Sequence, residues 1–266
     1  MTSDPNQLLL EVTALAREAG RAILEVYASS FSVTEKEDRS PLTEADLQSE
    51  RQILAGLRRI APEIPVLSEE SGQVPYATRR KWSRLWVVDP LDGTREFVQR
   101  NGEFTVNIAL VDNHRPVLGI VHAPVLERDY FACEGIGAFR SDSQTAARPL
   151  RVAKRGTGPV RVVGSRSHRG SSLDAFLGRV GPHEFVEVGS SLKLCLVAEG
   201  QADVYPRLGP TSEWDTAAGQ CVLEQAGGVV LKLDGEPLDY NAREEVLNPH
   251  FVGIADPDVD WLAMMR

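Results

Sequence analysis

The run WVVDPLDGT, from Trp86 to Thr94, constrains the fold more than any other stretch of the sequence. Its leading apolar residues are typical of a buried strand, and they run directly into Asp89. Pro90 holds Asp89 extended and has no N–H to donate to a sheet, so we expect the strand to end at this point. A second acid, Asp92, follows shortly after the first. The chain therefore places two carboxylates side by side where a core strand is predicted to stop.

The turn after Asp92 offers donors for an anion. Gly93 allows the chain to reverse sharply, and Thr94 is predicted to cap a short helix that extends through Phe97. The backbone N–H groups of Gly93 and Thr94 would point outward from the start of this helix, where anions bind readily. DPLDGT by itself also fits an ordinary surface turn, and the other acids decide between the two interpretations.

Further acidic residues have the same kind of setting. Glu69 and Glu70 follow the short apolar run PVL. Asp215 lies in the first turn of a predicted helix, and Asp46 follows Thr43 at another helix start. Each has an ordinary explanation, because charged loops are common and the helix dipole favours acids in a first turn. Together they repeat one arrangement, with acids at strand ends or helix starts beside small residues.

These acids predict a cation site if the fold brings them together. Close carboxylates cannot all remain charged without cations, since they would otherwise take up protons. The ligands of such a site would be Glu69, Asp89, Asp92 and Asp215. Oxygen ligands without His or Cys suit Mg²⁺ rather than zinc. Two or more Mg²⁺ ions beside a helix N-terminus are suited to the transfer of a phosphoryl group to water.

Composition narrows the class of protein. Of the 266 residues, 42% are hydrophobic and 25% are charged, as expected for a soluble globular protein, and the net charge is −9. An acidic chain is a poor match for a nucleic acid polymer, which proteins bind through clustered Lys and Arg. Cys133, Cys195 and Cys221 form no CxxC motif and are predicted to be reduced core thiols of a cytoplasmic protein. No apolar run is long enough for a transmembrane helix, and Asp4 and Glu11 argue against a signal peptide.

Periodicity predicts a mixed α and β fold in two parts. Amphipathic helices are expected over Leu9–Val26 and Glu44–Ile60, and alternating apolar residues from Phe104 predict an antiparallel meander. The polar segment Ser141–Pro159 is the expected seam between an α+β domain, residues 1–150, and an α/β domain, residues 151–266. In the second domain, strands are expected at 160–165, 185–189, 202–206 and 227–233, and helices at 171–180, 192–199 and 214–225.

The acidic motifs carry a resemblance to a known family. The sequence contains, in this order, Asp46, Glu69-Glu70, the run DPLDGT, and Trp214-Asp215 followed after eleven residues by Gly227-Gly228. In this combination it resembles the lithium-sensitive, Mg²⁺-dependent phosphatases of the inositol monophosphatase superfamily. Within that superfamily it is most similar to the CysQ-type 3′(2′),5′-bisphosphate nucleotidases. The stretches that carry this similarity are DPLDGTREFVQRNGEFTVNIALV, GSRSH, GSSLKLCLVAEGQADVYPRLGPTSEWDTAAG and LNPHF.

The resemblance implies a layered α-β-α-β-α sandwich with two or three Mg²⁺ ions as cofactors. The implied reaction is the hydrolysis of 3′-phosphoadenosine 5′-phosphate, a by-product of sulfate assimilation, to AMP and phosphate. The partner is then a small phosphorylated molecule rather than a nucleic acid polymer. The implied location is the cytoplasm, and the resemblance leaves open both a homodimer and a peripheral association with the inner membrane.

The family pattern also assigns metal ligands. For a first Mg²⁺ it implies Glu69, Asp89 and the Leu91 carbonyl. For a second it implies Asp89, Asp92 and Asp215, so that Asp89 bridges the two ions. A third, weaker ion would lie near Glu69. Leu91, Asp92 and Asp215 would also contact the substrate.

The same pattern implies how water is activated. A metal-bound water would attack phosphorus, helped by Glu69 and by the Thr94 hydroxyl, which Asp46 would orient. The backbone amides of Gly93 and Thr94 would hold the phosphate oxygens. A second metal-bound water would protonate the leaving oxygen, since no His lies obviously ready in the sequence.

The family positions that contact the nucleotide match His168, Ser190, Lys193 and Arg207. Their chemistry fits, because a second phosphate requires cationic or hydrogen-bonding partners. Without the resemblance, Lys193 and Arg207 equally fit solvated surface charges, and His168 fits a loop histidine with no role. Hydrolysis of inositol-1-phosphate or fructose-1,6-bisphosphate is the alternative activity, since the catalytic acids are shared. A non-catalytic nucleotide or metal sensor is the alternative class.

Overall fold

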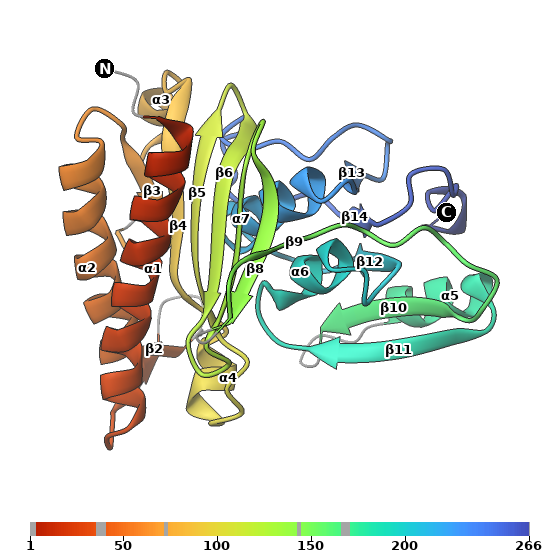
Figure 1. Cartoon of the computed structure of the whole chain (residues 1–266), viewed down its shortest axis with the longest axis horizontal. Coiled ribbons are helices and arrows are strands. Elements are labelled where there is room, and N and C mark those ends of the chain that lie inside the picture. The colour runs from red at the N-terminus through yellow and green to blue at the C-terminus, as the bar shows by residue number, and fades with distance from the viewer. Residues whose placement is uncertain (1–3, 36–40, 72–73, 143–144, 166–170, 266) are drawn as a thin grey trace.

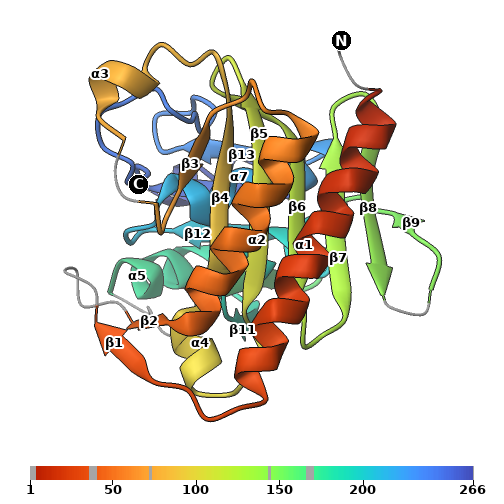
Figure 2. The same ribbon diagram turned by 90° about the vertical axis from the view of Figure 1, so that its left-hand side faces the viewer.

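Helices and sheets of the chain stack in the order α-β-α-β-α, as the resemblance implied (Figure 1). The structure is a computed structural model that describes residues 4–35, 41–71, 74–142, 145–165 and 171–265. The first layer consists of helices α1 (Pro5–Tyr27) and α2 (Glu44–Ile60), which cover one face of the larger sheet (Figure 2). Both helices were predicted, because their apolar residues recur at helical spacing.

The larger sheet has the strand order β3-β4-β5-β6-β7-β8-β9. β3 and β4 run parallel, and every later pair is antiparallel. Alternate residues of β4 enter different cores: Trp86 and Val88 pack under α1 and α2, whereas Leu85 and Val87 pack on the opposite face. The strands are β3 (Val66–Ser68), β4 (Arg84–Asp92), β5 (Thr105–Asp112), β6 (Arg115–Ala123), β7 (Arg128–Cys133), β8 (Gly137–Asp142) and β9 (Arg148–Pro149).

A second sheet has the order β11-β10-β12-β14-β13. Helices α6 (Leu192–Ala198) and α7 (Glu213–Gln225) pack between the two sheets, and α5 (Ser171–Val180) covers the outer face of the second one (Figure 1). β10 runs parallel to β11 and β12, while β14 runs antiparallel to both of its neighbours. The strands are β10 (Val160–Ser165), β11 (His183–Val188), β12 (Val204–Arg207), β13 (Val229–Lys232) and β14 (Phe251–Ile254). The smaller elements are β1 (Val33–Glu35), β2 (Pro41–Thr43), α3 (Tyr76–Arg79), α4 (Thr94–Val98) and η1 (Ala263–Met265).

Helix α7, which carries Asp215, lies directly against strand β6. Gly119 of β6 makes this approach possible, because a Cβ there would lie 2.5 Å from the Ala218 carbonyl oxygen and 2.8 Å from Cys221 Cβ. A close-packed interior has no room for an extra methyl group at such distances. The glycine therefore lets the helix rest on the sheet and fixes the distance of Asp215 from the strands beside it.

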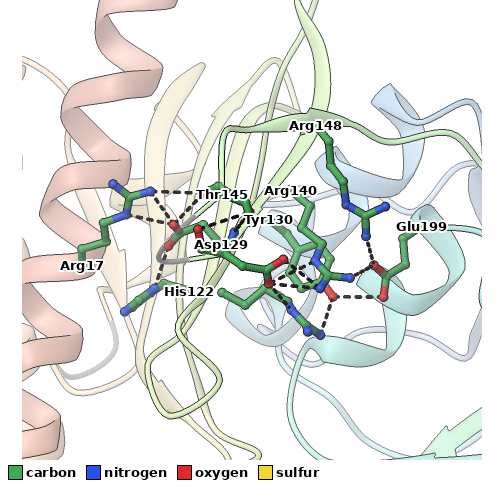
Figure 3. A network of polar contacts seen from close by, with 11 residues as sticks. Arg17, His122, Asp129, Tyr130, Arg140, Thr145, Arg148 and Glu199 are labelled. Atoms are coloured by element: carbon green, nitrogen blue, oxygen red, sulfur yellow. Dashed lines mark hydrogen bonds and ion pairs between the residues drawn. The ribbon is translucent and has the colours of Figure 1, made fainter.

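A network of partly buried ion pairs ties the layers together at β7 and β8 (Figure 3). Arg17 of α1 donates two hydrogen bonds to Asp129 Oδ2, at 2.9 and 2.6 Å. His122 Nδ1 lies 2.7 Å from Asp129 Oδ1. On the other side of the sheet, Arg140 donates to Glu199 Oε2 at 2.6 Å, beside the end of α6. Asp129 and Glu199 therefore each have an arginine partner.

Two predictions about the end of β4 are wrong. The strand does not end at Pro90 but continues to Asp92, because a β-bulge between Asp89 and Asp92 absorbs the residue that has no N–H. The residue that caps α4 is Gly93 rather than Thr94. Its φ of 90° lies in the left-handed region, which glycine adopts without strain.

The predicted seam contains more structure than its polarity indicated. β8 runs to Asp142 inside it, and β9 adds the last strand of the larger sheet. The meander and the alternation of strands and helices after residue 160 are confirmed, whereas β14 was not predicted. A domain boundary at residue 150 stays a prediction.

The cysteines agree with their prediction, since Cys133, Cys195 and Cys221 are all free and buried. Across the described ranges, no helix has both the length and the apolar character that a bilayer crossing requires.

Candidate active site

The bulge at the end of β4 positions the first two acids. Asp89 is buried, and its Oδ1 accepts a hydrogen bond from the Leu91 N–H at 3.0 Å. The Pro90 carbonyl accepts from Ser49 Oγ of α2 at 2.6 Å, which anchors the bulge to the helix layer. Asp92 is the last residue of the strand and pairs with Thr105 after the register shift. The irregular strand end therefore has a fixed shape.

Two other segments bring acids to the same place. Glu69 follows β3, and its N–H donates to the Val88 carbonyl at 3.2 Å, which extends the pairing with β4. Asp215 lies in the first turn of α7, where its Oδ2 accepts from the Ser212 N–H at 2.8 Å in a capping box. Carboxylate oxygens of Glu69, Asp89 and Asp215 all lie within 4.8 Å of one another. The structure thus brings together three of the four predicted acids.

The fourth acid, Asp92, is held beside this group by hydrogen bonds of its own. Its Oδ2 accepts from Ser191 Oγ at 2.6 Å. Burial raises the pKa of Asp92, and the positive charge of Lys193 offsets part of that rise. The pKa of Asp215 is raised by burial and, next in size, by the charge of Asp92. A divalent cation would relieve this crowding of negative charge, and its preference for oxygen ligands matches the acids present.

Thr94 and Asp46, predicted to act together, are in contact. Thr94 Oγ1 lies 3.3 Å from Asp46 Oδ1 and 3.4 Å from the Leu91 carbonyl. Asp46 is fixed in turn, because its Oδ2 accepts from the Thr43 N–H at 2.8 Å and from Thr43 Oγ1 at 2.7 Å. The capping box at the start of α2 therefore orients the Thr94 hydroxyl.

A cavity of about 260 Å³ joins Asp92 and Asp215 to a group of cations. Among its lining residues are Asp92, Gly93, Thr94, Ser190, Lys193, Arg207 and Asp215. Both Lys193 and Arg207 are 8% exposed, so neither is the solvated surface charge of the ordinary interpretation. Lys193 Nζ donates to the Ser190 carbonyl, and burial lowers the Lys193 pKa to about 8. Arg207 donates to the Pro210 carbonyl.

Two donors in this cavity are buried without a hydrogen-bond partner among the described residues. Within the described part of the chain, neither Ser190 Oγ nor Arg207 Nε has a hydrogen-bond partner. Buried donors of this kind are costly unless a ligand or water satisfies them. The fourth predicted nucleotide contact, His168, lies outside the described residues.

Several residues of the site were missed by the sequence reasoning. Ser191 and Asn107 contact Asp92, Ser49 holds the Pro90 carbonyl, and the Tyr205 ring lies 5.8 Å from Lys193 Nζ. The only sequence signal was proximity, because Ser191 follows Ser190 and Tyr205 precedes Arg207 by two positions.

Comparison with known proteins agrees with this geometry. The model of the inositol monophosphatase family matches residues 4–256. The chain belongs to that family. The sequence is 49% identical over 246 residues to the 3′(2′),5′-bisphosphate nucleotidase CysQ of Escherichia coli O157:H7, covering 92% of this chain and 98% of the relative. It is 37% identical over 260 residues to the CysQ of Haemophilus influenzae, covering 97% of each.

Solved structures place the fold in the inositol monophosphatase family as well. The crystal structure of CysQ from Bacteroides thetaiotaomicron, a bacterial member of the family, is 41% identical and superposes with a TM-score of 0.84, covering 96% of this chain and 99% of the other. An inositol monophosphatase from Thermotoga maritima, 24% identical with a TM-score of 0.79, shares the fold over 96% of this chain and 94% of its own.

Proposed function

We propose that this member of the inositol monophosphatase family is a Mg²⁺-dependent 3′(2′),5′-bisphosphate nucleotidase. Its reaction adds water to 3′-phosphoadenosine 5′-phosphate and yields AMP and phosphate. One observation carries the proposal: a single cavity joins the carboxylates of Asp92 and Asp215 to the buried cations Lys193 and Arg207. A substrate with two phosphates matches both halves of such a cavity. The relatives that bear the nucleotidase name support the same substrate class.

The acids fit the metal that the family generally uses. Glu69, Asp89 and Asp215 offer carboxylate oxygens within 4.8 Å of one another, as hard cations such as Mg²⁺ prefer. We propose Glu69, Asp89 and the Leu91 carbonyl for one ion, and Asp89, Asp92 and Asp215 for a second. A third, weaker ion near Glu69 completes the proposal. Bound Mg²⁺ would supply Lewis-acid stabilisation of the phosphate and lower the pKa of water.

Thr94 is the residue that we assign to the attacking water. Its hydroxyl donates its one proton to Asp46 Oδ1 or to the Leu91 carbonyl in a hydrogen bond, and its lone pairs remain to accept a hydrogen bond from the attacking water. Glu69 is assigned as the base that takes up the proton that this water loses when it attacks phosphorus. The amides of Gly93 and Thr94, at the start of α4, are assigned to the oxygens of the phosphate that is cleaved.

The second phosphate is assigned to the cationic end of the cavity. Lys193 and Arg207 would pair with it, and Ser190 Oγ, which has no partner in the described residues, would donate a hydrogen bond to it. Burial lowers the Lys193 pKa to about 8, and a bound dianion would favour the charged lysine. His168 keeps its assignment from sequence alone.

A second candidate function would use only the acidic end of the cavity. The acid cluster of Glu69, Asp89 and Asp215 would also serve inositol-1-phosphate or fructose-1,6-bisphosphate, because it acts on the phosphate that is cleaved and not on the rest of the substrate. The buried cations favour a substrate with a second phosphate over inositol-1-phosphate, and the relatives named as nucleotidases favour the nucleotide over fructose-1,6-bisphosphate. A small cytoplasmic substrate also agrees with the proposed location in the cytoplasm.

The test is Mg²⁺-dependent phosphate release from 3′-phosphoadenosine 5′-phosphate, inositol-1-phosphate and fructose-1,6-bisphosphate, measured side by side with and without Li⁺. We expect the highest kcat/KM for the nucleotide and inhibition by Li⁺. A higher kcat/KM for either sugar phosphate would replace the proposal with the second candidate. Binding of the nucleotide without release of phosphate from any substrate would indicate a sensor.

A further inference from the structure

We infer that Ser191 is a positioning residue, which together with Asn107 holds the Asp92 carboxylate in the orientation that the second cation requires. The inference rests on the proposed function, because it concerns the same cation site. Ser191 contacts neither the acid cluster of Glu69 and Asp89 nor the cations of the cavity through any hydrogen bond in the described chain. Its role must therefore come from the groups that it does contact.

Ser191 Oγ lies where three segments meet. It is 2.6 Å from Asp92 Oδ2, at the end of β4, and 2.6 Å from the Asp215 carbonyl oxygen, in the first turn of α7. Asn107 Nδ2 of β5 donates to it at 2.8 Å. One hydroxyl thus joins the larger sheet to a helix of the inner layer. The two residues that it contacts, Asp92 through a carboxylate oxygen and Asp215 through the backbone carbonyl, are the two acids assigned to the second cation besides the bridging Asp89.

The single hydroxyl proton of Ser191 decides which hydrogen bond this residue donates. A serine hydroxyl carries one hydrogen, so it can donate to only one of the two acceptors at 2.6 Å. Asn107 supplies the hydrogen bond that Ser191 accepts. An ionised carboxylate is the stronger acceptor, and the hydroxyl therefore donates to Asp92 whenever Asp92 is charged. Asn107 Nδ2, 3.5 Å from Asp92 Oδ2, faces the same oxygen.

The two carboxylate oxygens of Asp92 therefore have different roles. Oδ2 is engaged by Ser191 and faces Asn107, while Oδ1 makes no hydrogen bond to any described residue. Rotation of the carboxylate would break the bond to Ser191. Oδ1 is therefore held in one direction as the ligand atom. Groups that orient a metal ligand in this way typically change metal affinity or activity by about 10- to 100-fold when removed.

The backbone around Ser191 is held in a conformation that fixes the position of the Ser191 hydroxyl. Ser190 has a φ of 48°, in the left-handed region that non-glycine residues rarely adopt. The Gly189 N–H donates to Glu103 Oε2 at 2.8 Å, and a Cβ on Gly189 would lie 2.7 Å from Glu96 Cγ. The segment is thus packed closely against residues that precede and follow the end of α4. Backbone conformations of this kind occur chiefly at functional sites.

The experiment measures cation binding separately from catalysis. Mn²⁺ is titrated into the metal-free enzyme without substrate, and bound ions are counted by electron paramagnetic resonance. For Ser191→Ala we expect one Mn²⁺ to bind as in wild type and a second to bind about 10- to 100-fold more weakly. The Mg²⁺ concentration for half-maximal rate should rise by a similar factor. Saturating Mg²⁺ should then restore most of kcat, which a merely structural defect would not allow.

Matched variants separate positioning from folding. Thr13→Val removes a buried hydroxyl that donates at 2.7 Å to Leu9 in α1, far along the chain from the site, and should leave both Mn²⁺ affinities unchanged. Ser191→Cys, which keeps the size of the side chain but donates weakly, should fall between wild type and alanine. If Ser191→Ala does not fold, Asn107→Ala and Ser191→Cys report on the same hydrogen bonds. Ser191→Ala and Asn107→Ala should not add, because both act on Asp92 Oδ2.

The outcomes are distinguishable from failure of the proposed function. If wild type binds two Mn²⁺ ions but hydrolyses no bisphosphate nucleotide, the function fails and the inference about Ser191 can still be tested by titration. If the nucleotide is hydrolysed but Ser191→Ala binds both ions with wild-type affinity, the inference is overturned and the function stands. An equal loss in Thr13→Val would also overturn it.

Discussion

The molecule contains two groups of polar side chains around buried acids, and they differ in how the charges of these acids are balanced. In the network of Figure 3, burial raises the pKa of Asp129, but hydrogen bonds from His122 and Arg17 outweigh it, so the net pKa is lowered. In the cavity, burial and a neighbouring acid raise the pKa of Asp215. The first group is complete within the protein, whereas the second has an excess of carboxylates at one end.

That difference separates a structural role from a functional one. A buried acid with cationic and hydrogen-bonding partners holds layers together and leaves little for a ligand to do. A buried cluster of acids costs stability until a cation joins it, and perturbed acids of this kind concentrate at functional sites. The contrast therefore predicts that substitutions in the network will change stability, while substitutions in the cavity will change metal binding and catalysis.

The largest effect is expected for Asp89→Asn. Loss of the bridging carboxylate should lower kcat by at least roughly 10³-fold, at the upper end of what a single charge-stabilising group contributes. The fold should persist, so circular dichroism should be unchanged. Mg²⁺ should raise the Tm of wild type but not of the variant, because a ligand stabilises only a protein that binds it. Near-normal turnover would refute the metal assignment.

Asp129→Asn is the matched substitution in the paired network. Because Asp129 has the half-exposed Arg17 and the buried His122 as partners, we expect a loss of about 1–2 kcal/mol in the free energy of unfolding, between the values for an exposed and for a fully buried ion pair. Urea denaturation measures the loss, and kcat for the folded fraction should not change. A fall in kcat without a loss of stability would break the contrast between the two groups.

A smaller effect is expected for Thr94→Ala. Loss of the hydroxyl that orients water should lower kcat by about 10²-fold, the lower end of the range for general acid–base catalysis. Mg²⁺ affinity should hardly change, because the hydroxyl contacts Asp46 and the Leu91 carbonyl without belonging to the acid cluster. Thr94→Ser keeps the hydroxyl and should retain most of the activity. Equal losses of rate and affinity would place Thr94 among the ligands.

Lys193→Ala tests the cationic end of the cavity. A hydrogen bond to a charged group contributes about 1.5–3 kcal/mol, so kcat/KM for the bisphosphate nucleotide should fall by roughly 10- to 100-fold. Hydrolysis of a monophosphate such as inositol-1-phosphate should fall much less. Lys154, an exposed lysine paired with Asp256, provides the control, since Lys154→Ala should affect neither substrate. Equal losses on both substrates would show that Lys193 does not bind the second phosphate.

The smallest effect concerns pH and the network. The pKa of Asp129 is lowered in the folded state, so its stabilisation is present above the ordinary pKa of an aspartate and is lost as pH falls through the lowered value. Each unit of difference contributes about 1.4 kcal/mol. Urea unfolding of wild type between pH 5 and strongly acidic pH should therefore show a loss that Asp129→Asn lacks. The same slope in both proteins would contradict the assignment.

Much of the fold could be predicted because it depends on local patterns. The apolar spacing of α1 and α2 and the alternation from Phe104 to Leu110 are carried by neighbouring residues, and burial of one face follows from them. The bulge at Pro90 could not be predicted, since it depends on β5 as a partner strand. Strand β14 was missed for a similar reason, because it joins two strands distant in the sequence.

For the site too, features that depend on residues distant in the sequence could not be predicted. Asp89 and Asp92 could be recognised because they are close in the chain and interrupt an apolar run. Ser191 could not, because its importance arises only when β4, β5 and α7 meet around it. The burial of Lys193 and Arg207 could not be predicted either, because in the sequence alone both fit solvated surface charges, whereas in the fold they are buried in the wall of the cavity.

The most direct test of the cation site is the position of Mn²⁺ in crystals of the protein. An anomalous difference map from Mn²⁺-soaked crystals should show a peak between the carboxylates of Glu69, Asp89 and Asp215, with a second ion beside Asp92. Asp89→Asn should lose the peak, while Asp129→Asn should retain it. Absence of a peak among these acids at saturating Mn²⁺, or an unchanged peak in Asp89→Asn, would contradict the account.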